Sequence, residues 1–295
     1  MADIHLVGPR HTLESMEARE RIVEQRPRNG AEALVCIQRQ LERFYRARDN
    51  RAFFLRAYYI MTAEVTSAIR GEGDFDKPIF FDPRWVDGLI GGFARLYFDS
   101  LKKPACKAWE LAHELASQRR SSILQNLLLG INAHINYDLA ISAYEFIPHQ
   151  DSQLLARRKF DHDQINNVLM RSMPKIQRTL AREFGGAIRF LSGLFGKMDE
   201  FIGLAGLRYY RDRVWNNVLA FLSAKDESER EKVRMRLNWE SLQVAEVISD
   251  GGLLNHGIWN LDRLLRRWRF EQPMLETAGS IHARGPLAHR LQRPF

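Results

Sequence analysis

The chain has 295 residues, of which 45% are hydrophobic and 27% are charged, and its formal net charge is +8. These proportions are typical of a soluble globular protein, and a chain of this length can bury a core without disulfides or metal staples. Because the chain has only two cysteines, a disulfide framework and a cysteine-built zinc site are excluded. The chain has no apolar run of about 18 residues or more, so no transmembrane helix is predicted.

The two ends of the chain differ in composition from its middle. The first 30 residues have no apolar stretch before a small-residue cleavage site, so they do not resemble a secretory signal and the cytoplasm is the expected compartment. Residues 263–295 contain seven Arg against two Glu, a net charge of +5. We expect a partly ordered extension over residues 1–30, a helical domain over 31–272 and a basic tail over 273–295. The tail is interpreted as a loosely ordered terminus, and contact with an anionic surface or nucleic acid is the alternative.

Between these ends, apolar residues recur with the helical period, and strand-like alternation is missing. A stretch rich in Gly, Asp and Pro over residues 71–83 predicts a loop, and Pro174 is expected to end the helix before it. The pattern predicts an all-α protein, a single irregular bundle of about eight to ten helices. In chain order, the predicted helices cover residues 30–49, 52–70, 83–103, 107–118, 121–146 and 161–173, and then roughly 175–195, 197–222, 228–249 and 252–270.

The predicted helix over residues 121–146 carries polar side chains on an otherwise apolar face. His134 and Asp138 are four residues apart, so their side chains lie one above the other on a helix that is buried on most sides. A buried carboxylate costs several kcal/mol unless it is paired, hydrogen-bonded or bound to a metal. Asp138 therefore needs a partner, and His134 is the nearest. Glu145 is predicted on the same stripe, about 16 Å further along the helix, where it would contact a substrate.

The helix predicted over residues 161–173 repeats this arrangement. His162 and Asn166 are four residues apart on its predicted inward face, and Asp161 and Asp163 flank His162. Asp161 is also well placed as the N-cap of this helix. Two helices that each direct a His and an oxygen ligand inward predict a metal site between them, with Zn, Fe or Mn as the ion. Such an ion would lower the pKa of a bound water to about 7.

The same residues also have a purely structural interpretation, which the sequence leaves open. A His and an Asp one helical turn apart often form a salt bridge inside a large helical core. Asn166 would then bond the backbone of a neighbouring helix, and Asp161 would only cap its own.

Three sequence blocks are similar to those of one family. They are Tyr58, Thr62 and Val65; the block from Phe93 to Phe98; and the block from Asn132 to Leu139, which is the most specific. Through them the chain resembles the domain of unknown function 5995 family, over roughly residues 50–220. The resemblance implies a helical fold and groups these residues together, but the family has no assigned activity and so implies no reaction.

The first functional hypothesis is a metal-dependent enzyme, hydrolytic in type, that acts on a hydrophobic small molecule. Its divalent ion, Zn, Fe or Mn, would lie between the bundle helices. The residues that this hypothesis predicts are metal ligands (His134, Asp138, Asp161 and His162), catalytic residues (Tyr58, Asn132 and Asp163) and substrate-binding residues (Tyr97, Glu145 and Asn166).

Two other functions remain open at this point. A terpene-cyclase-like or metal-free ligand-binding protein is one, because Asp138, Ser142 and Glu145 approach the magnesium motif of terpene cyclases but are one residue short of it. The other is a non-enzymatic interaction protein in which the His and Asp side chains are internal pairs.

Overall fold

The computed structural model describes residues 26–72, 75, 77–147, 151–184 and 204–250. The N-terminal extension up to residue 25, the helix predicted over residues 252–270 and the basic tail lie outside the described residues. None of the described helices is long and apolar enough to cross a membrane.

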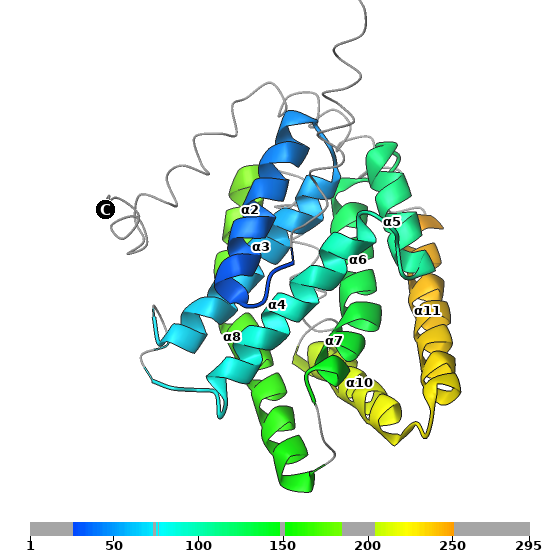
Figure 1. Ribbon diagram of the computed structural model, residues 1–295. Helices are drawn as coiled ribbons and strands as arrows, with labels where there is room; N and C mark the ends of the chain where they lie inside the picture. The colour runs from blue at the N-terminus through cyan, green and yellow to red at the C-terminus, as the bar shows by residue number, and fades with distance from the viewer. Residues whose placement is uncertain (1–25, 73–74, 76, 148–150, 185–203, 251–295) are drawn as a thin grey trace, which may run out of the picture.

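The described part of the chain is built of helices and contains no strand, which confirms the predicted all-α bundle (Figure 1). A short π-helix, η1, is continuous with the helices on either side of it. In order, the elements are α2 (Gly30–Arg46), α3 (Arg51–Arg70), α4 (Pro83–Ser100), α5 (Lys107–Ser117), α6 (Ile123–Ala133), η1 (His134–Asp138), α7 (Leu139–Glu145), α8 (Ser152–Phe184), α10 (Leu204–Ser223) and α11 (Glu227–Asp250).

Local sequence signals set the starts of several of these helices. The side chain of Asn29 accepts a hydrogen bond from the first turn of α2, and that of Asp82 does the same for α4, which has Pro83 in its first turn. Ser122 and Gln125 form a reciprocal capping box at the start of α6. These caps satisfy backbone N–H groups that a buried helix start would otherwise leave unpaired.

Helix α3 is the central element of the bundle. It packs against α2, α4, α5, α6 and α8, and most of its side chains are buried (Figure 1). In its first turn, the ring of Phe54 touches Gly130 of α6. A Cβ at position 130 would lie 2.3 Å from Cγ of Phe54, so only a glycine allows α3 and α6 to approach this closely. This approach brings the aromatic side chains of α3 to the polar residues of η1.

The π-helix changes which residues of the long helix face the core. In a π-helix each hydrogen bond spans one more residue than in an α-helix, so the buried stripe shifts by about one residue after Asp138. Ser142 and Ala143 are therefore fully buried, whereas Glu145 is 41% exposed and pairs with Arg95 at 3.2 Å. The prediction that Glu145 shares an inward stripe with His134 was wrong for this reason.

Helix α8 is longer than the sequence pattern indicates. It begins at Ser152 and continues past Pro174 to Phe184, so both predicted boundaries were wrong. Proline removes one helical hydrogen bond, but contacts with α3 on the C-terminal side hold the helix in place. There, Glu183 pairs with Arg56, and Phe184 packs edge-on against Phe53.

We expect Gly130→Ala to lower the free energy of unfolding by about 1–3 kcal/mol, although alanine normally stabilises a helix relative to glycine. The new methyl group would displace the Phe54 ring at the tightest contact between α3 and α6. Urea unfolding measures the effect. Gly88→Ala is the matched control, because its Cβ would meet the edge of the partly buried Phe146 ring at 3.0 Å, and its loss should be smaller. Equal or greater stability in Gly130→Ala would contradict this account of the packing.

Candidate functional site

An apolar cavity of about 100 Å³ lies among α3, α4, α8 and the continuous helix formed by α6, η1 and α7. Its walls are mainly aliphatic and aromatic, with Phe93 from α4 and Leu169 from α8 among them. Three lining residues carry polar groups: Tyr58 and Thr62 of α3, and His134 of η1. A mostly apolar cavity with a few convergent polar groups is the usual form of a small-molecule site.

His134 belongs to a buried chain of hydrogen bonds. Its Nδ1 lies 3.0 Å from Oδ2 of Asp138, and the same oxygen accepts a hydrogen bond from Nε1 of Trp109 at 2.9 Å. All three side chains are almost fully buried. Because Trp109 can only donate, Oδ2 is the acceptor of this group, and we assign the proton between the pair to Nδ1 of His134. This tautomer leaves a lone pair on Nε2, which makes no hydrogen bond to any residue that the structure describes.

Aromatic rings fix the orientation of the His134 imidazole. Phe93 stacks on it with the ring centroids 3.5 Å apart and the planes within 6°, and Tyr58 meets it edge-on at 4.4 Å. Burial lowers the pKa of His134, against the opposing effect of Asp138, and burial raises the pKa of Asp138. The imidazole is therefore neutral near pH 7, and its Nε2 carries a lone pair.

Tyr58 is the predicted site residue that the structure places beside His134. Its hydroxyl is buried, with Thr62 as its polar neighbour. Burial, and to a smaller degree the charge of Asp138, raises the pKa of the Tyr58 hydroxyl. The hydroxyl thus keeps its proton and is a hydrogen-bond donor at the cavity.

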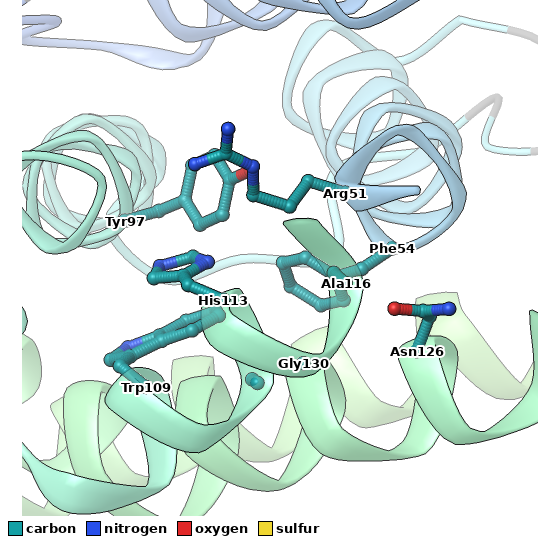
Figure 2. Close-up of a pocket in the computed structure, with 9 residues that line it drawn as sticks. Arg51, Phe54, Tyr97, Trp109, His113, Ala116, Asn126 and Gly130 are labelled. Carbon is teal, nitrogen blue, oxygen red and sulfur yellow. The ribbon is translucent and has the colours of Figure 1, made fainter. Parts of the chain in front are cut away.

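Behind Trp109 lies a second, smaller cavity of about 10 Å³, which is the size of one water molecule (Figure 2). His113 lies over the Trp109 indole there, with centroids 4.9 Å apart, and its Nε2 is 2.9 Å from Oγ of Ser100. Burial lowers the pKa of His113 to about 3. Tyr97, predicted to bind substrate, lines this small cavity and not the larger one, and its ring lies 6.3 Å from that of His134.

The sequence reasoning missed Trp109 and His113. They are four residues apart on the predicted helix over residues 107–118, so they share one face. That spacing was the available signal. Only the fold shows that this face supports Asp138.

The predicted residues of α8 lie in other surroundings. The carboxylate of Asp161 accepts hydrogen bonds from the backbone N–H groups of Phe81 and Asp82, at 2.5 and 2.9 Å. It lies inside the helix, so the N-cap prediction was wrong. His162 contacts the indole of Trp215, with centroids 5.5 Å apart.

Three further predicted residues do not line the cavity. Asp163 is half-exposed and pairs with Lys159 at 2.7 Å. Asn132 faces α11, where its Nδ2 donates to the carbonyl oxygen of Ser241 at 2.8 Å. Asn166 is buried on α8, and among the described residues its Oδ1 has no hydrogen-bond partner.

The predicted metal ligands are therefore not brought together. Within the described ranges, no group of three or more His, Cys, Asp and Glu side chains is placed to hold a metal ion. Asp161 already binds the backbone, and Asp138 binds Trp109 and His134. The residues present do not fit the predicted ion, and a bound metal stays a prediction from the sequence.

Comparison with known proteins gives one match. A family model described as a family of unknown function (DUF5995) matches residues 31–251. No curated protein and no solved structure matches the chain.

We expect His134→Ala to lower the free energy of unfolding by about 3–5 kcal/mol at pH 8, because it leaves the Asp138 carboxylate buried without its main partner. The loss should shrink as the pH falls. Burial raises the pKa of Asp138, and removal of His134 removes an opposing effect. A raised pKa in the folded state means that stability is present at low pH and is lost as the pH rises through that value.

Chemical unfolding at several pH values between about 5 and 8 tests this expectation. The double variant His134→Ala, Asp138→Asn has no carboxyl group to titrate and is the control. If His134→Ala and the double variant showed the same pH dependence, Asp138 would not be the buried charge that His134 stabilises.

Proposed function

The chain belongs to this family of unknown function, and from the geometry of its site we propose that it is a hydrolase of small, apolar esters with His134 as its general base. The observation that carries the proposal is the pair of Asp138 and His134. It ends in a neutral Nε2 that has no hydrogen-bond partner in the described part of the chain, on a residue that lines an apolar cavity. A carboxylate that orients an imidazole in this way is a common arrangement for proton transfer.

Each polar residue of the site has its own role in the proposed hydrolysis. A water molecule bound beside Nε2 of His134 gives up a proton to it and attacks the carbonyl carbon of the ester. The hydroxyl of Tyr58 donates a hydrogen bond to the carbonyl oxygen as negative charge develops there. His134 then returns the proton to the departing alkoxide, so that the products are an acid and an alcohol. Asp138 keeps Nδ1 protonated and stabilises the imidazolium between these steps.

The shape of the cavity supports an apolar substrate. Apart from Tyr58, Thr62 and His134, its walls come from aliphatic side chains, Met61 and aromatic rings. A volume of about 100 Å³ is about two-thirds of the roughly 150 Å³ of an engineered cavity that holds a single benzene ring, so a short acyl chain fits and a long one does not. A charged group in this space would lose its hydration without a partner of opposite charge.

The first test is the hydrolysis of p-nitrophenyl esters with acetyl, butyryl and octanoyl groups. We expect the purified protein to prefer the short acyl chains. The variant His134→Gln should lower kcat by about 100-fold to 10,000-fold, because glutamine cannot accept the proton. No difference between His134→Gln and the unsubstituted protein would overturn the proposed role. A chelator added in parallel separates this mechanism from a metal-dependent one, because only the latter loses activity.

A second variant pair tests the cavity. Leu169 lines the cavity, and Leu169→Trp should fill it and raise KM at least about tenfold. Asn167 is exposed on the same helix, so Asn167→Trp adds the same side chain on the solvent side and should leave KM unchanged. Equal effects of both variants would place the substrate outside this cavity.

A further inference from the structure

Two phenylalanine side chains are exposed side by side where α4 and α8 meet. Phe81, just before α4, is 60% exposed, and Phe160 of α8 is 46% exposed. Their rings meet edge-on with the centroids 6.5 Å apart. Single exposed apolar residues are common on protein surfaces. Two adjacent exposed aromatic side chains from separate elements form an apolar patch, and such patches mark interaction sites.

The Asp161 carboxylate holds this pair in place. It is fully buried directly after Phe160, and it accepts hydrogen bonds from the backbone N–H groups of Phe81 and Asp82. Asp82 in turn caps α4 and pairs with Arg158 at 2.7 Å. These bonds fix the backbone under both rings, so the surface does not depend on a loop that adjusts its shape.

The segments that carry the two rings also carry two exposed arginines, and the exposed carboxylates nearby are ion-paired. The guanidinium of Arg157 lies over the Phe81 ring, 4.8 Å from its centroid, and Arg84 is exposed in the first turn of α4. Neither arginine has a carboxylate partner among the residues that the structure describes. The neighbouring carboxylates are engaged elsewhere, Asp82 with Arg158 and Asp163 with Lys159.

The surface adjoins two of the helices that wall the apolar cavity, α4 and α8. On α8, the lining residues Ile165 and Leu169 follow Phe160 by roughly 8 and 14 Å along the helix axis. On α4, the lining residues Leu89 and Ile90 follow the start of the helix, and Phe81 lies just before that start. A partner at this surface therefore lies at the start of α4 and about 8 Å from Ile165 along α8.

We infer that Phe81 and Phe160, with Arg84 and Arg157, dock the protein on an anionic lipid membrane. The rings enter the boundary between headgroups and acyl chains, and the guanidinium groups bind lipid phosphates. Charge complementarity favours this partner over a second copy of the chain, because a symmetric contact would bring the arginines of two copies together. The inference goes beyond the proposed hydrolysis and does not depend on it.

Co-sedimentation of the full chain with phosphatidylcholine vesicles, with and without phosphatidylglycerol, tests the inference in the absence of any ester. We expect binding to the vesicles that contain phosphatidylglycerol, weakened by added salt. The variant Phe81→Ser, Phe160→Ser should lower the partition coefficient at least about tenfold, whereas Phe81→Trp, Phe160→Trp should retain binding. Arg84→Glu, Arg157→Glu should remove the preference for phosphatidylglycerol.

The matched control is Met235→Ser, Trp239→Ser, which removes two exposed apolar side chains from α11 and should bind as the unsubstituted chain does. Thermal unfolding of each variant checks that the fold is kept. The basic tail is the same in all of them, so binding that survives Phe81→Ser, Phe160→Ser comes from another part of the chain and overturns the inference. The inference is also overturned if the unsubstituted chain binds neither kind of vesicle. It is overturned as well if the chain forms a dimer that Phe81→Ser, Phe160→Ser dissociates. None of these outcomes bears on ester hydrolysis.

Discussion

The buried carboxylate of Asp138 is the constraint around which this bundle is organised. A carboxylate out of contact with water is tolerated only when donors surround it, and the donors here come from two separate parts of the chain. Trp109 of α5 supplies one and His134, one turn earlier in η1, supplies the other. The contact between α5 and the long helix α6–η1–α7 is thus fixed by polar geometry as well as by apolar packing. His113 extends the same arrangement, because it stacks on the indole that Asp138 requires.

The π-helix and the glycine at position 130 serve this geometry from two sides. The wider turn of η1 begins at His134 and ends at Asp138, so the one irregular segment of the long helix coincides with the polar pair. Gly130, one turn earlier, lets the Phe54 ring approach the helix axis and close the aromatic surroundings of His134. π-Helical turns are frequent at functional sites, and here the turn has a definite effect on which side chains meet.

The sequence predicted the fold class and the pairing of His134 with Asp138, because both follow from short-range helical periodicity. It also placed Tyr58 with them, through the family blocks. It failed where long-range contacts decide the outcome. Pro174 lies inside α8 because contacts with α3 hold the residues beyond it, and Asp161 binds the backbone before α4, about 80 positions away in the chain. Glu145 faces solvent because of the π-helix before it, and a helical pattern drawn at 100° per residue cannot predict such a π-helix.

The stack of His113 on Trp109 has an optical consequence. A protonated imidazole in contact with an indole quenches its fluorescence, whereas a neutral imidazole does so much less. Because burial lowers the pKa of His113 to about 3, the imidazole is neutral near pH 7 and quenches the Trp109 emission only weakly. The same indole is hydrogen-bonded to Asp138, so its emission wavelength reports the electric field at the carboxylate. The protein thus carries, next to a deeply buried carboxylate, a chromophore of its own.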